Sequence, residues 1–145
     1  MGAHKINMQR YFVNCSLRPL RITALLLFFL LMVGLGSIPG QAHALSDRFG
    51  DKLLHVLAYG LMTAISFGAI VTRPRWQAMI SIMLIALLGL IDESIQSFLP
   101  YRNASLLDWC FDIASAILVA MLLLLFSFSE SDITSDTETH AQKNQ

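Results

Sequence analysis

Charged residues are scarce in this chain of 145 residues: Lys, Arg, Asp and Glu make up 14% of it, while 55% of the residues are hydrophobic. A soluble domain usually carries about a quarter charged residues. The composition therefore excludes an ordinary soluble fold and indicates a small integral membrane protein. Ten basic and ten acidic residues cancel, and with no nucleic-acid-binding motif we expect no nucleic-acid partner.

Cysteine and the familiar catalytic motifs are also lacking. Cys15 and Cys110 are the only two cysteines, which excludes a disulfide framework or a metal-thiolate cluster and predicts two unpaired thiols. The chain has no Gly-rich phosphate loop, no H-E-x-x-H, no G-x-S-x-G and no Cys/His zinc pattern. These absences argue against the corresponding nucleotide-binding, metalloprotease, hydrolase and zinc-binding classes.

Long apolar segments are what the chain does have, at residues 22–38, 53–71, 76–99 and 107–128. A membrane-spanning helix needs about 20 apolar residues, and short connections place neighbouring helices antiparallel. The predicted fold is all-α, a polytopic antiparallel bundle of four transmembrane helices in one domain, 22–128. A basic tail, 1–21, precedes it, and an acidic tail, 129–145, rich in Ser and Thr, is predicted to be disordered. Five glycines could allow close helix approach: Gly34, Gly36, Gly60, Gly68 and Gly89.

The distribution of Lys and Arg predicts the orientation. With both termini in the cytoplasm, seven basic residues lie inside and three, Arg48, Lys52 and Arg102, lie outside. A rival interpretation treats the first segment as a signal peptide, because a basic region and an apolar run precede Ala42-His43-Ala44. That basic region is long for a signal peptide, so we expect the first span to be retained and the protein to be N-in/C-in in the cytoplasmic membrane.

Polar residues gather at the predicted outer ends of spans two, three and four. Ionisable groups at membrane depth cost about 2.5 kcal/mol or more each, which makes them functional candidates. The candidate catalytic residues are His55, Asp92 and Glu93. The candidate ligand-binding residues are Asp51, Lys52, Tyr59, Gln96, Arg102, Ser105, Asp108 and Asp112.

At the start of span two, residues 51, 55 and 59 share one helix face because they are spaced by four. Asp51 could instead serve as a helix cap, and Lys52 could simply extend to the membrane interface. His55 would lie about one turn into the apolar region, where no structural role requires an imidazole.

At the end of span three, Asp92 and Glu93 are adjacent and should face different neighbours, because successive helical residues point about 100° apart. Gln96 can share the face of Asp92. Two carboxylates beside one histidine suggest acid–base or ligand chemistry. The structural alternative is a salt bridge from these acids to Lys52 or Arg102.

The third connection and span four supply the remaining candidates. Pro100 should end the preceding helix, and Ser105 followed by Asp108 resembles a capping box. Arg102 could neutralise the acids or bind a phosphate through its guanidinium group. The spacing of Asp108, Asp112 and Ser115 predicts a polar stripe that enters the membrane, with Asp112 facing the bundle.

The constellation holds five acids against two bases, a net charge of −3 with His55 neutral. It can keep protons, bind an oxygen-preferring divalent cation such as Mg²⁺ or Ca²⁺, or stay hydrated. The sequence leaves these alternatives open, and we assign no individual metal ligands.

In order along the chain, these residues resemble the VanZ-like family of small bacterial membrane proteins over about residues 22–125. The matching motifs are Ser37-Ile38-Pro39, Asp51-Lys52-x-x-His55-x-x-x-Tyr59, Asp92-Glu93-x-x-Gln96 and Pro100-x-Arg102-x-x-Ser105-x-x-Asp108. The family pattern continues with Asn and Gly where this chain has Asp112 and Ser115. The resemblance implies a polytopic bacterial membrane protein, and the family's name comes from a member associated with teicoplanin resistance.

We therefore expect a cell-envelope protein whose outward polar pocket binds or processes an anionic lipid-linked or cell-wall intermediate. Arg102 and Lys52 would hold its phosphate or carboxylate, and His55 with Asp92 or Glu93 would transfer a proton or hold a metal. The rival class is a non-enzymatic accessory whose polar cluster locks the bundle or docks a partner. An ion pathway is disfavoured because the inner halves of the spans lack charged residues. Membrane lipid is the expected partner, and homo-oligomerisation stays open.

Overall fold

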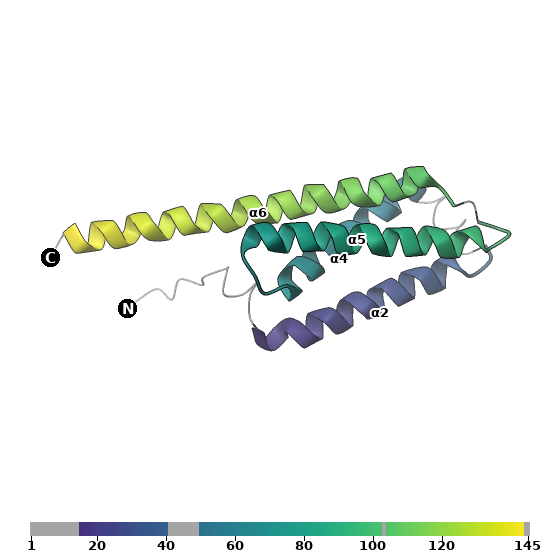
Figure 1. Ribbon diagram of the computed structural model, residues 1–145, viewed down its shortest axis with the longest axis horizontal. Helices are drawn as coiled ribbons and strands as arrows, with labels where there is room; N and C mark the ends of the chain where they lie inside the picture. Colours follow the sequence, from purple (N-terminus) through teal and green to yellow (C-terminus); the bar gives the residue numbers. More distant parts are fainter. Residues whose placement is uncertain (1–14, 41–49, 103, 144–145) are drawn as a thin grey trace.

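Four long helices make up the computed structural model, which describes residues 15–40, 50–102 and 104–143 (Figure 1). After a short 3₁₀ turn, η1 (Cys15–Leu17), come α2 (Arg18–Gly36), α4 (Asp51–Ala69), α5 (Pro74–Ser97) and α6 (Leu106–Lys143). Each contains a stretch long and apolar enough to cross a membrane: Arg18–Gly36, Lys52–Ala69, Pro74–Ser97 and Leu106–Ser127. The predicted all-helical fold with four candidate spans is confirmed over the described residues.

The helix ends follow from local sequence. Pro19 and Pro74 lie in the first turns of α2 and α5, where proline's missing N–H costs nothing. Gly50 precedes α4 with φ of 83°, a left-handed backbone that favours glycine. α5 ends at Ser97, shortly before Pro100, as expected.

Both flanking segments differ from the sequence prediction. α2 begins at Arg18 rather than at residue 22. α6 continues to Lys143, where disorder was predicted from residue 129, and this last part extends past the other three helices (Figure 1). Residues 106–143 contain neither Gly nor Pro, so nothing in the chain interrupts the helix that the span begins. The proposed cleavage motif Ala42-His43-Ala44 lies outside the described residues.

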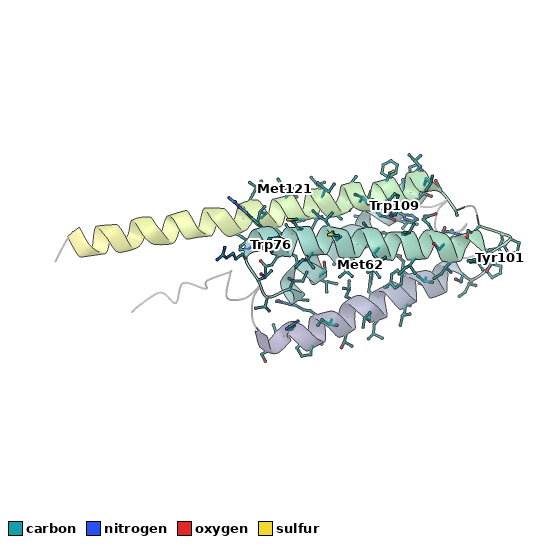
Figure 2. The ribbon with its side chains drawn as sticks, in the orientation of Figure 1. Met62, Trp76, Tyr101, Trp109 and Met121 are labelled. Atoms are coloured by element: carbon teal, nitrogen blue, oxygen red, sulfur yellow. The ribbon has the colours of Figure 1, made fainter. Side chains whose placement is uncertain are left out.

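α4 is the central helix, because it contacts α2, α5 and α6, and α5 also packs on α6. The main apolar core contains Leu25 and Phe29 of α2, Met62 of α4, Ile85 of α5 and Ala116 of α6. Met62, labelled in Figure 2, is fully buried. Among the long helices, α2 makes its larger contact with α4.

The bundle surface is apolar on every helix. Exposed large side chains include Leu30 of α2, Leu57 of α4, Met83 of α5 and Leu125 of α6. Acids and a histidine lie inside instead. This arrangement is the reverse of a soluble protein's and suits a lipid environment, in which polar side chains are sheltered in the interior of the bundle.

Two of the five glycines mark close approaches of helices that hold the polar residues. A Cβ on Gly60 would lie 2.9 Å from Ser115 Oγ, and one on Gly89 would lie 2.8 Å from Asp112 Oδ2. Gly68 lies against Arg21, whose guanidinium donates a hydrogen bond to the Gly68 carbonyl. The expectation is wrong for Gly34 and Gly36, where a Cβ would meet nothing within 4 Å.

Candidate functional site

The predicted polar residues converge where α4 and α6 begin and α5 ends. His55 lies four residues after the start of α4, and Glu93 lies four before the end of α5, about 6 Å along each axis at about 1.5 Å per residue. The labelled Tyr101 marks this end of the bundle in Figure 2. Seven predicted side chains are buried together there: His55, Tyr59, Asp92, Glu93, Gln96, Asp108 and Asp112.

His55 and Asp112 form a buried pair. The distance from His55 Nδ1 to Asp112 Oδ1 is 2.9 Å, and Asp112 is fully buried. The imidazole also stacks on the Tyr59 ring, with 5.8 Å between ring centroids. The carboxylate therefore fixes the orientation of the imidazole through Nδ1 and leaves Nε2 on the opposite edge.

A chain of hydrogen bonds joins α4, α5 and the connection before α6. Tyr59 donates to Asp92 Oδ2 at 3.1 Å, and Gln96 Nε2 donates to the same oxygen at 3.0 Å. Arg102 Nη2 then donates to Gln96 Oε1 at 3.0 Å. The prediction that Gln96 shares the face of Asp92 is confirmed.

Glu93 and Lys52 do not form the salt bridge with each other that the structural alternative predicted. Glu93 Oε2 accepts a hydrogen bond from the Ser105 backbone N–H at 2.6 Å. Lys52 Nζ lies 2.9 Å from Asp108 Oδ1 and 5.2 Å from the centre of the Phe111 ring. Asp92 and Glu93 thus face different neighbours, as predicted, while the lysine pairs with an acid of α6.

Ser105 contributes less to the site than predicted, and the side chain of Asp51 is not described by the structure. Ser105 enters the network through its backbone, and its carbonyl accepts the N–H of Asp108 at 2.9 Å as α6 begins. Asp51 is the first residue of α4, but its side chain lies outside the described part of the chain. The predicted polar stripe of α6 is confirmed, since Asp108, Asp112 and Ser115 are all buried.

Two further residues hold this site in place: Trp109, which sequence reasoning missed, and Ser115, which it expected only as part of the polar stripe. Trp109 Nε1 donates to the Ala86 carbonyl at 2.9 Å, and Ser115 Oγ donates to the Val56 carbonyl at 2.7 Å. Both bonds connect α6 to a neighbouring helix. Gly60 lies against Ser115, and Gly89 lies against Asp112 and Trp109. The sequence predicted close helix approach at both glycines but not which residues they would meet.

A second set of polar residues was missed towards the other end of the bundle. Thr63 and Ser66 of α4 and Gln77 and Ser81 of α5 are buried. Thr63 and Ser66 bond carbonyls of their own helix, and Gln77 Nε2 donates to the Ile70 carbonyl at 2.6 Å. The sequence offered one signal for α5: residues 77, 81, 85, 89 and 93 are spaced by four, so Gln77 and Ser81 share the buried face of Glu93.

Some buried polar atoms lack a partner among the described residues. At the site these are Glu93 Oε1, Asp112 Oδ2 and Arg102 Nε. An unsatisfied buried polar atom costs about 1–3 kcal/mol, so its presence in a native site suggests a ligand group.

His55, Glu93 and Asp108 could hold a metal ion, because each offers a ligand atom and these atoms lie within 4.8 Å of one another. The site therefore combines an oriented imidazole, several carboxylates and two cationic side chains. This set can transfer protons, bind a cation or bind an anion.

The fold and this site together define a class: a small multi-pass helical membrane protein with a buried, ionisable cluster at one end of its bundle. No protein-family model, no curated protein and no solved structure matches the chain.

Proposed function

We propose that this chain is a VanZ-like protein of the bacterial cytoplasmic membrane, with four antiparallel spans and both termini in the cytoplasm. Its polar site faces outward and binds an anionic group of a lipid-linked or cell-wall intermediate. The orientation rests on seven Lys and Arg residues inside against three outside, and the family on the ordered motifs described above.

Arg102 is the residue on which the binding proposal depends. Its Nη2 is fixed by Gln96 at 3.0 Å, while its Nε is buried with no partner among the described residues. A guanidinium group with one nitrogen held and another without a partner suits a phosphate or carboxylate oxygen, which would accept the Nε–H.

Lys52 would supply a second positive charge. Its side chain is 48% exposed, whereas its partner Asp108 is 8% exposed. Because breaking this pair would leave Asp108 buried without its cation, the ammonium would attract an anion from its place beside Asp108. Arg102 would thus define the anion's position, and Lys52 would add attraction from the rim.

The experiment is native mass spectrometry of the detergent-purified chain, comparing the wild type with Arg102→Ala, His55→Ala and Arg73→Ala. Arg73→Ala is the matched control, because it removes the same charge from an exposed position before α5. A copurifying phospholipid or polyprenyl phosphate should be present in the wild type and control and reduced at least about tenfold in Arg102→Ala, the loss of a charged hydrogen bond.

The second candidate is an accessory protein in which the network only locks the helices or docks a partner. The shared Asp92 oxygen favours it, since both Tyr59 and Gln96 donate to that atom and satisfy it within the bundle. Identical lipid profiles in all four folded proteins would contradict the binding proposal and favour this candidate.

A further inference from the structure

Three buried side chains from three different helices meet at one point. His55 comes from α4, Glu93 from α5 and Asp108 from α6, and they are 7%, 7% and 6% exposed. Their ligand atoms lie within 4.8 Å of one another. Atoms bound to one tetrahedral ion at about 2.0–2.2 Å lie about 3.3–3.6 Å apart, so each pair of ligand atoms needs to close by at most about 1.5 Å.

Glu93 provides an independent sign that this point suits a cation. One oxygen, Oε2, is held by the Ser105 N–H at 2.6 Å, which fixes the carboxylate. The other, Oε1, is buried and has no hydrogen-bond partner among the described residues. When ionised, a carboxylate oxygen only accepts, so a cation or a donor would satisfy it.

His55 is arranged as metal-binding histidines usually are. Asp112 Oδ1 lies 2.9 Å from Nδ1; with the ring proton on Nδ1, Nε2 would be the nitrogen that binds a metal ion. A carboxylate in this position fixes the ring and raises its basicity as a ligand. Asp112 would then be a positioning residue that acts through His55.

Charge also favours a divalent ion. This group contains three acids, Glu93, Asp108 and Asp112, and one base, Lys52, so its formal charge is −2 when all four are ionised. Lys52 Nζ lies 2.9 Å from Asp108 Oδ1, and its side chain is half exposed. A metal ion can therefore take its place beside Asp108 while the ammonium moves towards water.

We propose that His55, Glu93 and Asp108 bind a first-row divalent transition-metal ion such as Zn²⁺ or Mn²⁺, with Asp112 positioning His55. An imidazole ligand favours these ions over the Mg²⁺ or Ca²⁺ expected from the acidic residues alone. Three protein ligands leave coordination positions open, as in catalytic and ligand-binding sites. The metal site does not depend on the identity of the anion near Arg102.

The test uses the untagged full chain in detergent, stripped with EDTA and titrated with Zn²⁺ or Mn²⁺ alone. Elemental analysis should find one ion per chain. Glu93→Gln should weaken binding by at least about 100-fold, and Asp112→Asn by about 10–100-fold. Glu130→Gln, in α6 about 33 Å along the axis from Asp108, is the matched control and should bind as the wild type does.

Two further measurements keep the proposal falsifiable if Glu93→Gln fails to fold. Lys52→Met should raise the affinity by about tenfold, because it removes a competing cation from Asp108. The visible spectrum of bound Co²⁺ should change in Asp112→Asn, since the orientation of His55 changes. Equal affinity in wild type, Glu93→Gln and Lys52→Met, or no stoichiometric ion in the wild type, would overturn the metal site. Because the ion is the only probe, neither result depends on copurified lipid.

Discussion

His55 and Asp112 illustrate how a buried polar pair behaves in this bundle. Removing one partner leaves the other buried without compensation, at a cost of about 3–5 kcal/mol, whereas replacing both with apolar residues can be nearly neutral. We therefore expect His55→Leu and Asp112→Leu each to destabilise the protein by about 3 kcal/mol. The double variant should be clearly more stable than the sum of the single effects predicts. Unfolding in mixed detergent micelles would measure all three.

This cycle also separates a lock from a binding site. If the pair only fastens α4 to α6, the stable double variant should keep every property of the protein. If the pair serves a site, the double variant should fold and yet bind no ion. Additive destabilisation would contradict the direct coupling that the 2.9 Å contact predicts.

At the scale of helices, Gly89 decides how closely α5 approaches α6. A Cβ there would lie 2.8 Å from Asp112 Oδ2 and 3.1 Å from Trp109 Cδ1. We expect Gly89→Ala to destabilise the bundle by about 1–3 kcal/mol, as overpacking does. In the control Gly34→Ala the new methyl group meets nothing within 4 Å, so stability should stay the same or rise by up to about 1 kcal/mol. Thermal unfolding of both variants in detergent would check this, and equal melting temperatures would refute the close contact.

Helix positions were largely predictable from sequence, because length and apolarity alone identify a span. The burial of Asp112 and the different directions of Asp92 and Glu93 also followed, since helical geometry fixes angles along one helix. The partner of Lys52 did not, because Asp108 lies on another helix and the pairing depends on how each helix is rotated. The continuation of α6 was missed because its polar composition was taken as disorder, although it contains no helix breaker.

At the scale of the whole molecule, polar groups divide unequally between the two ends. The end near Tyr101 holds acids, a histidine and two cations, whereas the buried polar residues towards the other end, Thr63, Ser66, Gln77 and Ser81, carry no charge. An ion moving past these uncharged buried residues would lack the paired charges that ion pathways use. The distribution favours a site reached from one side over a path through the bundle.

The side of the membrane on which this charged end lies is the last prediction. The Lys and Arg distribution predicts that the α5–α6 connection lies outside and the α4–α5 connection inside. With Cys15 and Cys110 replaced by Ser, Ala104→Cys should react with a membrane-impermeant maleimide in intact cells, and Thr72→Cys only after lysis. Both positions are exposed in the structure, so unequal access to the connections would reflect the membrane. The reverse pattern would place the site in the cytoplasm and exclude a ligand on the outer surface, because a site about one turn from the helix ends can be reached only from its own side.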